Sequence, residues 1–295
     1  MAGLTAASMM QAGAYYVQVA KRTAAGYPVG TVADPETITA DTTTHALFVG
    51  SLDSFTPPVP TTEFAVDRGG QAVRGSMALG NSDFGSATIQ LSEFNETLNA
   101  LIKDAAVDIT SVVGLASSPA NVAQKHFPRT VTMVTGRAWS DTDGADYWLT
   151  WVFHNCQWME ASGGGTSQAS GVNPNPVSYT LNLSKSTKFV TGVSFSESAG
   201  QYVVGGTDAW TKIRSRYPLA LTSYVADGSA TTFILGYRPY YSTVTTGNND
   251  NSFTKNGVAT APTSCVTTTG VVTIAAAGDS GDVHVAVYPT EFTAI

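Results

Sequence analysis

Apolar and polar residues alternate along most of this chain in short runs, which is the pattern of half-buried β-strands. The cleanest alternation runs from Val177 to Leu183. Because successive side chains of a strand point to opposite faces, it predicts a sheet with one dry and one polar face. Equally clear strands are expected at Arg129–Thr135, Asp146–Phe153 and Lys188–Phe195. In the second of these, the pattern places Tyr147, Leu149, Trp151 and Phe153 on one side and Trp148, Thr150 and Val152 on the other.

Shorter strand-like runs precede them, interrupted by Pro57-Pro58, Gly69-Gly70 and the cluster Gly80-Asn81-Ser82-Asp83. The expected strands are Ala46–Gly50, Thr62–Val66, Ala72–Leu79 and Ala87–Leu91. The N-terminal residues 1–32 contain one apolar stretch, Ala14–Ala20, and are interpreted either as an arm or as a first strand with a loop. Many short strands at even spacing are typical of an all-β domain.

One amphipathic helix of about three turns is predicted after these runs. Ser92 can cap it, and Glu93 and Glu96 complement its positive end. The residues Phe94, Leu98, Leu101, Ile102 and Ala105 fall on one face. Such a stripe is typical of a helix packed over a sheet.

A second unit is expected to begin at Tyr217-Pro218, after the basic residues Lys212, Arg214 and Arg216. This gives two units, residues 1–216 and 217–295. Strands are expected at Leu219–Ala226, Thr231–Tyr237, Ser252–Val258, Ser264–Thr269, Val271–Ala276 and Asp282–Tyr288. Their spacing is that of a small immunoglobulin-like sandwich, in which Val283, Val285 and Val287 would form one inner face.

Composition supports a β protein of two domains. The chain has 295 residues, 43% hydrophobic and 13% charged, and the low charge suits a subunit whose faces are covered by copies of itself. An extracellular-type β protein would have the same make-up. The net charge of −7 makes tight nucleic-acid binding improbable, although an acidic wall would let DNA slide past.

The N-terminal sequence and the two cysteines indicate in which compartment the protein is made. Lys21 and Arg22 follow the apolar stretch instead of preceding it, so no signal peptide is expected, and no apolar run is long enough for a membrane span. Cys156 and Cys265 lie far apart in the two units, which predicts two free, buried thiols. A long Gly/Ser/Asn/Pro loop, Ala161–Pro176, is expected to be mobile or held by a neighbour.

No catalytic, cofactor or metal site is predicted. Gly278-Asp279-Ser280-Gly281 resembles a serine-protease string, but Asp282 follows it and a turn between strands is the better interpretation. Asp141, Asp143, Gly144 and Asp146 do not keep calcium-loop spacing and predict a hairpin turn. The isolated histidines, His45, His126, His154 and His284, show no metal spacing. Trp148, Trp151 and Trp158 could line a sugar site but fit a core or subunit interface better.

Two stretches resemble phage major tail tube proteins across about the first 215 residues. The first is GSATIQLSEFNETLNALIKDA, from Gly85 to Ala105; the second runs from Arg129 to Gly192 and includes NPNPVSYTL and FVTG. The final 75 or so residues resemble the immunoglobulin-like domains appended to phage tail and capsid proteins, with Lys255-Asn256-Gly257 at a strand-to-strand turn.

The resemblance implies a β-sandwich or partial barrel with one flanking α-helix, plus the C-terminal immunoglobulin-like β-sandwich. It also implies self-assembly into stacked, hexameric rings around a channel for DNA ejection, with residues 1–31 and 161–176 at the ring-to-ring contacts. Expected partners are copies of itself, other tail proteins (tape measure, baseplate, terminator) and DNA in transit, with no membrane partner.

The implied location is the virion, assembled in the host bacterial cytoplasm. A C-terminal domain outside the tube would favour a non-contractile tail. The alternatives are a baseplate ring protein, a capsid or decoration protein, and a carbohydrate-binding module; no enzyme is expected.

Overall fold

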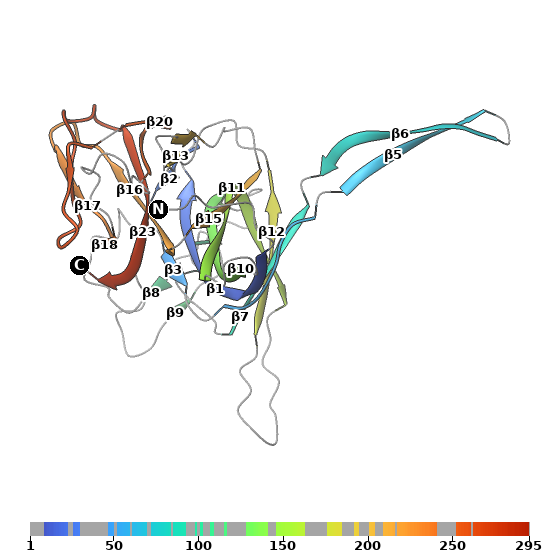
Figure 1. Ribbon diagram of the computed structural model, residues 1–295, viewed down its shortest axis with the longest axis horizontal. Helices are drawn as coiled ribbons and strands as arrows, with labels where there is room; N and C mark the ends of the chain where they lie inside the picture. The colour runs from blue at the N-terminus through green and yellow to red at the C-terminus, as the bar shows by residue number, and fades with distance from the viewer. Residues whose placement is uncertain are drawn as a thin grey trace, which may run out of the picture.

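The computed structural model describes residues 9–22, 26–29, 47–49, 52–59, 61–69, 72–83, 85–92, 98, 101–102, 107–108, 115–116, 128–140, 146–162, 176–184, 192–194, 201–203, 209–215, 217–240, 252–260 and 262–294. These residues form a mainly β protein with antiparallel sheets (Figure 1). Among them no helix is long and apolar enough to cross a membrane.

The strands follow the chain in two groups. Residues 1–216 hold β1 (Met9–Arg22), β2 (Pro28–Val29), β3 (Leu47–Val49), β4 (Leu52–Thr56), β5 (Thr61–Gly69), β6 (Ala72–Asp83), β7 (Ser86–Leu91), β8 (Val107–Asp108), β9 (Leu115–Ala116), β10 (Thr130–Ser140), β11 (Asp146–Ser162), β12 (Val177–Leu183), β13 (Gly192–Ser194), β14 (Gln201–Val203) and β15 (Trp210–Ser215). Residues 217–295 hold β16 (Leu219–Val225), β17 (Thr232–Ile234), β18 (Tyr237–Pro239), β19 (Ser252–Lys255), β20 (Val258–Ala259), β21 (Ser264–Cys265), β22 (Val271–Thr273) and β23 (Val283–Ala294).

The main sheet is curled so that its ends approach each other. Its order is β2-β1-β10-β11-β12-β7-β4, with β15 paired to β11 and β3 paired to β1. The strands β3 and β4 nearly adjoin in sequence, yet β3 pairs with β1 and β4 pairs with β7 at the other end of the path. The segment 47–56 therefore links the two ends of the sheet.

The space inside the curl is the main hydrophobic core. Its largest fully buried side chains include Tyr179, Phe153 and Ile89, which come from β12, β11 and β7. Of the predicted helix the structure describes Ser92, Leu98, Leu101 and Ile102; the last three have helical backbone and are buried in this core. The rest of that segment, with Glu93 and Glu96, lies outside the described residues, so the bounds of the helix stay a prediction.

The C-terminal residues add two further layers. The first is a sheet in the order β16-β23-β19-β20, with β18 also paired to β23; the second is the sheet β17-β22-β21. Between them lies a core built around Phe233, Leu235, Val272 and Tyr288. The hairpin β19–β20 turns at Asn256 and Gly257, whose φ angles are 49° and 78°. Two positive φ angles are what a type I′ hairpin turn requires, so the predicted turn is confirmed.

The C-terminal layers share a core with the main sheet (Figure 1). Its members come from both groups of strands: Ala20, Val131, Met133, Val152 and Ile213 from the main sheet, and Leu219, Leu221, Val283, Val285 and Val287 from β16 and β23. A buried glutamine joins the layers, because Gln18 Oε1 on β1 accepts a hydrogen bond from the Leu221 amide at 2.9 Å. This contact satisfies a buried amide that would otherwise cost about 1–3 kcal/mol.

The structure corrects the expectation that single faces are buried. The valines at 283, 285 and 287 do share one face, but Ala286 and Tyr288 on the opposite face of β23 are buried too, in the outer core. β11 is also buried on both faces, with Trp151 and Phe153 on one face and Val152 on the other. The prediction for β12 is confirmed, since its bounds are Val177–Leu183 and its apolar positions are the buried ones. Of the two interpretations of the N-terminus, residues 9–22 form a strand within the main sheet.

Coupling between the layers can be measured with tryptophan fluorescence, because all five tryptophans of the chain precede residue 217. We expect Val285→Ala, which removes a fully covered side chain from the shared core, to lower the free energy of unfolding by about 1–3 kcal/mol. The urea transition followed by tryptophan emission should shift to lower urea.

The matched control is Val225→Ala on the neighbouring strand β16, where the side chain is 41% exposed. It should move the transition by less than about 0.5 kcal/mol. If Val285→Ala left the urea midpoint of the tryptophan transition unchanged, the C-terminal layers would unfold independently of the main sheet.

Candidate assembly interface

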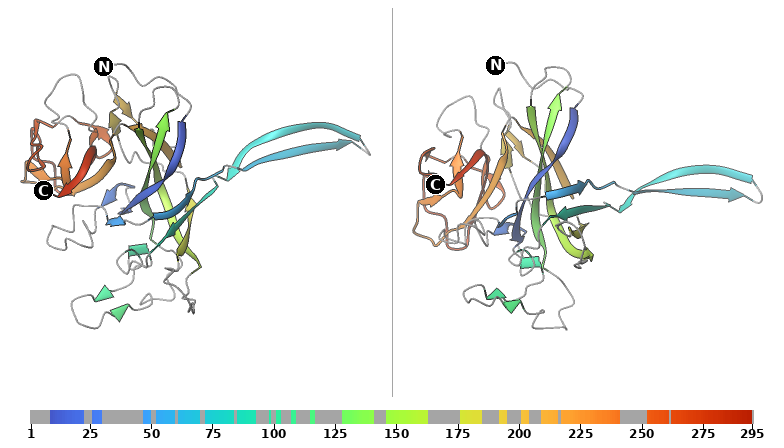
Figure 2. Two further views of the ribbon diagram at one scale, coloured as in Figure 1. Left: turned by 60° about the horizontal axis from the view of Figure 1, so that its bottom comes forward. Right: turned by 90° about the horizontal axis from the view of Figure 1, so that it is seen from below.

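A long β-hairpin projects from the body of the protein, as Figures 1 and 2 show from three directions. It consists of β5 and β6, which pair antiparallel from Thr61 opposite Asp83 to Gly69 opposite Ala72. The nine residues of β5 span about 30 Å at roughly 3.3 Å per residue. We call residues 61–83 the arm.

The arm is a continuation of two body strands. β4 ends at Thr56 and β5 begins at Thr61, while β6 ends at Asp83 and β7 begins at Ser86. Body and arm are thus two parts of one long hairpin that bends between them. Since β4 and β7 belong to the main sheet, the arm extends directly from two strands of that sheet.

The bend depends on Gly85. Its φ of +77° lies in the left-handed region that favours glycine. A Cβ built on Gly85 would stand only 2.6 Å from the carbonyl oxygen of Val59, on the opposite strand of the bend. Glycine therefore permits both the backbone angle and the close approach of the two chains at the base of the arm.

Within the described part of the chain, the strands of the arm pair only with each other. Their outer edges thus present unpaired backbone N–H and C=O groups, which are a template for pairing with another chain. A two-stranded hairpin alone is at best marginally stable in water and encloses no core. These properties make the arm the candidate site for contact with another molecule.

The sequence stretch that resembled a protease motif forms the connection between β22 and β23. Ser280 is exposed there, and Asp282 holds the turn by accepting hydrogen bonds from the Asp279 amide at 2.8 Å and from Lys255 Nζ at 2.8 Å. The Lys255 ammonium, together with Asn256, lowers the pKa of Asp282 to about 2. The role visible for these residues is structural.

The other candidate residues are dispersed. His45, His126, Asp141, Asp143 and Gly144 lie outside the described residues, and Asp146 forms an ion pair with Arg137 across the β10–β11 hairpin. Cys156 and Cys265 are buried free thiols, as predicted, and burial raises the pKa of Cys156 to about 11. Among the described residues, no group of three or more His, Cys, Asp or Glu side chains could hold a metal ion.

Two of the three tryptophans considered for a sugar site are covered by protein. Trp158 packs edge-on against Tyr179, with ring centroids 5.5 Å apart, and its indole N–H donates to Thr132 Oγ1 at 3.0 Å. Trp151 lies beside Trp210 at 4.8 Å, under the Lys212 ammonium at 5.1 Å. Trp148 is half-buried. Covered rings cannot stack on a sugar, so the preference for a core position holds for Trp151 and Trp158.

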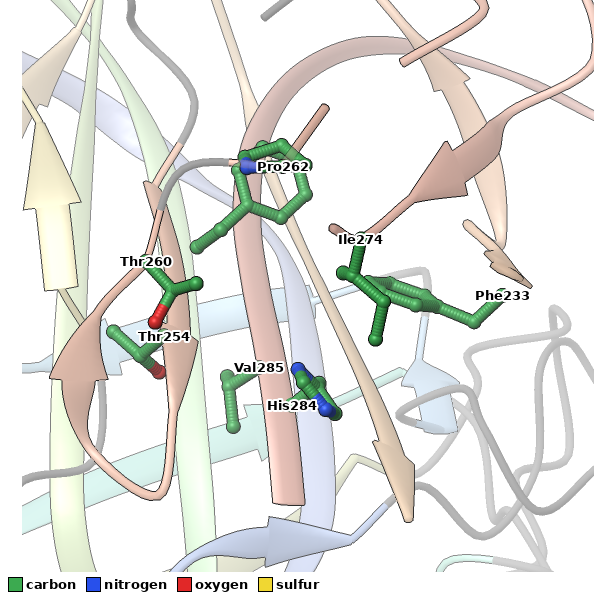
Figure 3. A pocket seen from close by; sticks show the side chains of 8 residues that line it. Phe233, Thr254, Thr260, Pro262, Ile274, His284 and Val285 are labelled. Atoms are coloured by element: carbon green, nitrogen blue, oxygen red, sulfur yellow. The ribbon is translucent and has the colours of Figure 1, made fainter. Parts of the chain in front are cut away.

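A small pocket lies in the C-terminal layers (Figure 3). Figure 3 shows Phe233 and Ile274 on one side of it and Thr254 and Thr260 on the other, with His284 between them. Its enclosed volume is only about 10 Å³, which is room for about one water molecule. The pocket is therefore too small for an organic ligand.

No protein-family model matches the chain, and no curated protein matches it.

The sequence contains a hairpin signal at the arm that the prediction of individual strands did not take into account. The predicted strands Thr62–Val66 and Ala72–Leu79 are parts of β5 and β6, which are separated by two residues, Gly70 and Gln71. Two strand runs joined by a glycine-containing pair predict a hairpin. The cluster Gly80–Asp83, interpreted as a break, continues β6. That the hairpin leaves the body could not be predicted, because it depends on the bend at Gly85.

The base of the arm can be tested with Gly85→Ala. The left-handed φ alone costs alanine about 1–2 kcal/mol. The overlap with the Val59 carbonyl must add to this, since backbone has to move, so we expect a loss of free energy of unfolding of roughly twice that or more. Urea denaturation followed by circular dichroism measures it.

Gly281→Ala is the matched control, because Gly281 has a φ of +94° and open space where a Cβ would lie. It isolates the cost of the backbone angle. Equal losses for the two variants would mean that close packing against Val59 does not constrain the arm.

Proposed function

We propose that this chain is a structural subunit of a phage tail tube, which self-assembles into stacked rings that form a hollow conduit for DNA. The observation that carries the proposal is the arm, a projecting hairpin whose two outer edges pair with no other strand among the described residues. A second copy of the chain offers such an arm a partner. When the arm of each copy contacts a different surface on the next, the contact is heterologous and generates rings or open filaments.

The body supports the same proposal. A main sheet whose ends are linked by residues 47–56 fits the partial barrel or sandwich implied by the resemblance. The two outer layers, β16-β23-β19-β20 with β17-β22-β21, fit an immunoglobulin-like sandwich for residues 217–295. In this proposal the C-terminal unit is fixed against the body by the shared core, with its β17-β22-β21 sheet as the outermost layer.

Composition is compatible with a conduit. With 22 acidic and 15 basic residues the chain carries a net charge of −7, so its surfaces would not hold DNA by its phosphates. The proposed partners are copies of this chain and other tail proteins, with DNA only in transit. The proposed location is the virion, and the proposed role requires no enzymatic step or cofactor.

Negative-stain electron microscopy of the purified protein tests the proposal. Long hollow tubes of uniform width are the expected result. Single rings would favour a baseplate protein, and closed shells or binding to capsids would favour a head protein. A stable monomer that bound glycans on an array would replace the proposal by a carbohydrate-binding module.

The contribution of the arm has its own test. Replacing residues 60–84 by a short Asn-Gly turn should leave a folded monomer, because β4 and β7 pair with each other, and β7 with β12, without the arm. The expected result is a loss of assemblies in micrographs and a monomer mass by light scattering. Retained tryptophan emission and circular dichroism would serve as the folding control; tubes formed by the armless variant would contradict the role of the arm.

A further inference from the structure

The main sheet divides at one point, which lies in the middle of β11. One edge of β11 pairs with β10 along most of its length. Its other edge pairs with β15 over residues 148–153 and with β12 over residues 156–162. The two residues between, His154 and Asn155, form the fork: the His154 amide donates to the Ala209 carbonyl at 3.2 Å, and the Asn155 carbonyl accepts from the Ser184 amide at 2.9 Å.

Side-chain hydrogen bonds hold both branches to the fork. On the β15 side, His154 Nε2 lies 2.9 Å from Thr211 Oγ1. On the β12 side, Arg129 Nη1 donates to Asn155 Oδ1 at 3.1 Å and to Ser184 Oγ at 3.0 Å. His154 is 1% exposed and Asn155 7% exposed. The junction of the two branches is thus a polar cluster in which His154 and Asn155 are buried and Arg129 is exposed.

Two arginines and a cysteine lie on the elements that meet at the fork. Arg22 lies at the end of β1, and its backbone amide bonds the Arg129 carbonyl at 3.0 Å. Arg129 directly precedes β10, and Cys156 follows the fork on β11, with its thiol 3.2 Å from Thr130 Oγ1 and 3.1 Å from Thr132 Oγ1. The positive charge of Arg22 therefore disfavours a second positive charge on the histidine, whereas Arg129 is exposed and bonds the neighbouring Asn155.

The imidazole is held neutral by its surroundings. Burial, and then the positive charge of Arg22, lower the pKa of His154 to about 4 from its ordinary value near 6.5. Its Nδ1 atom is buried without a hydrogen-bond partner among the described residues. A protonated ring must donate from both nitrogens, so protonation would bury an unpartnered N–H beside a guanidinium.

We propose that His154 is an acid-sensitive latch, whose protonation opens the fork between β12 and β15 to water while the rest of the main sheet stays folded. Opening relieves the buried charge because it admits water to the imidazolium, and this water also screens the imidazolium from the Arg22 guanidinium. Only residues 216–218 connect β15 to β16. A displacement of β15 is therefore also expected to disturb the contact of β16 with the main sheet.

The pH range of the opening follows from linkage. In the open state His154 binds a proton near pH 6.5, whereas in the closed state it binds one only near pH 4. The closed fork is therefore favoured fully above about pH 6.5, and it weakens as the pH falls from there toward 4. The opening equilibrium should rise roughly five- to sevenfold for each unit of pH between 6.5 and 4.5.

Hydrogen exchange with mass spectrometry on the intact chain tests the latch. Between pH 6.5 and 4.5, protection factors of peptides from β15 and from residues 148–156 should fall about fortyfold, after correction for the intrinsic rate. Peptides from β7 and from residues 177–183 should keep theirs. Simultaneous loss in all of these peptides would mean global acid unfolding and would overturn the proposal.

The variant His154→Gln keeps a neutral group that can bond Thr211 and should abolish the acid response of β15. The matched control is His284→Gln on β23, a histidine that is 4% exposed and lies in the outer core. That variant should leave the response of the fork unchanged. An undiminished response in His154→Gln would overturn the proposal.

A second measurement needs no variant. Exchange of the imidazole C2 hydrogen reports the protonation of individual histidines in the wild-type chain. Its midpoint for His154 should coincide with the pH at which the β15 peptides lose protection. A His154 midpoint near pH 6.5 without loss of β15 protection would show that the ring titrates in a closed fork, and the latch would be wrong.

Discussion

Burial of β11 on both faces and along both edges is the constraint on which the remaining layers depend. Trp151, Phe153 and Trp158 face the core inside the curled sheet, and Val152 faces the core shared with β16 and β23. Each of these side chains gains about 1.5–3 kcal/mol when it leaves water, but only if a layer covers it. A 17-residue strand with apolar residues on both faces can be stable only in the middle of a stack.

β23 has the same property on the C-terminal side, and together the two strands order the layers. Val285 packs toward the main sheet, while Tyr288 packs in the core under the β17-β22-β21 sheet. The Tyr288 hydroxyl lies 3.2 Å from Oγ1 of Thr222 on the neighbouring strand β16. Burial raises the pKa of this hydroxyl well above its ordinary value. The C-terminal residues therefore have the strand spacing of a separate sandwich but are joined to the main sheet by a continuous apolar contact. Sequence periodicity identifies the strands of such a unit, whereas it cannot tell whether one of its faces is covered from outside.

The same limit explains what could be predicted from the sequence and what could not. β12 has one buried face, and strict alternation predicted its bounds. The Asn256-Gly257 turn was predictable because few residue pairs adopt two positive φ angles. β15 was missed because Lys212 and Arg214 were interpreted as part of a basic cluster before the second unit. In the structure the Lys212 ammonium lies over the ring of Trp151, and the Arg214 guanidinium lies over the ring of Tyr147. Such cation–π contacts bring together residues some 60 positions apart, and no local pattern encodes them.

The fork and the arm are two places where the regular pairing of the main sheet is interrupted. At the fork, β11 exchanges β15 for β12. Arg129, Thr211 and Ser184 bond the polar groups of His154 and Asn155 there, except for His154 Nδ1, which has no partner among the described residues. At the arm, β4 and β7 continue past the core, and no body strand within the described residues covers the backbone edges of β5 and β6. Unpaired edges are normally a hazard that proteins suppress. Here the unpaired edges lie on a hairpin that continues two strands of the core and leaves the body at a glycine. Such a hairpin is stabilised when another molecule supplies the partner for its edges. This is the physical reason for proposing an assembling subunit and not a monomeric binding module.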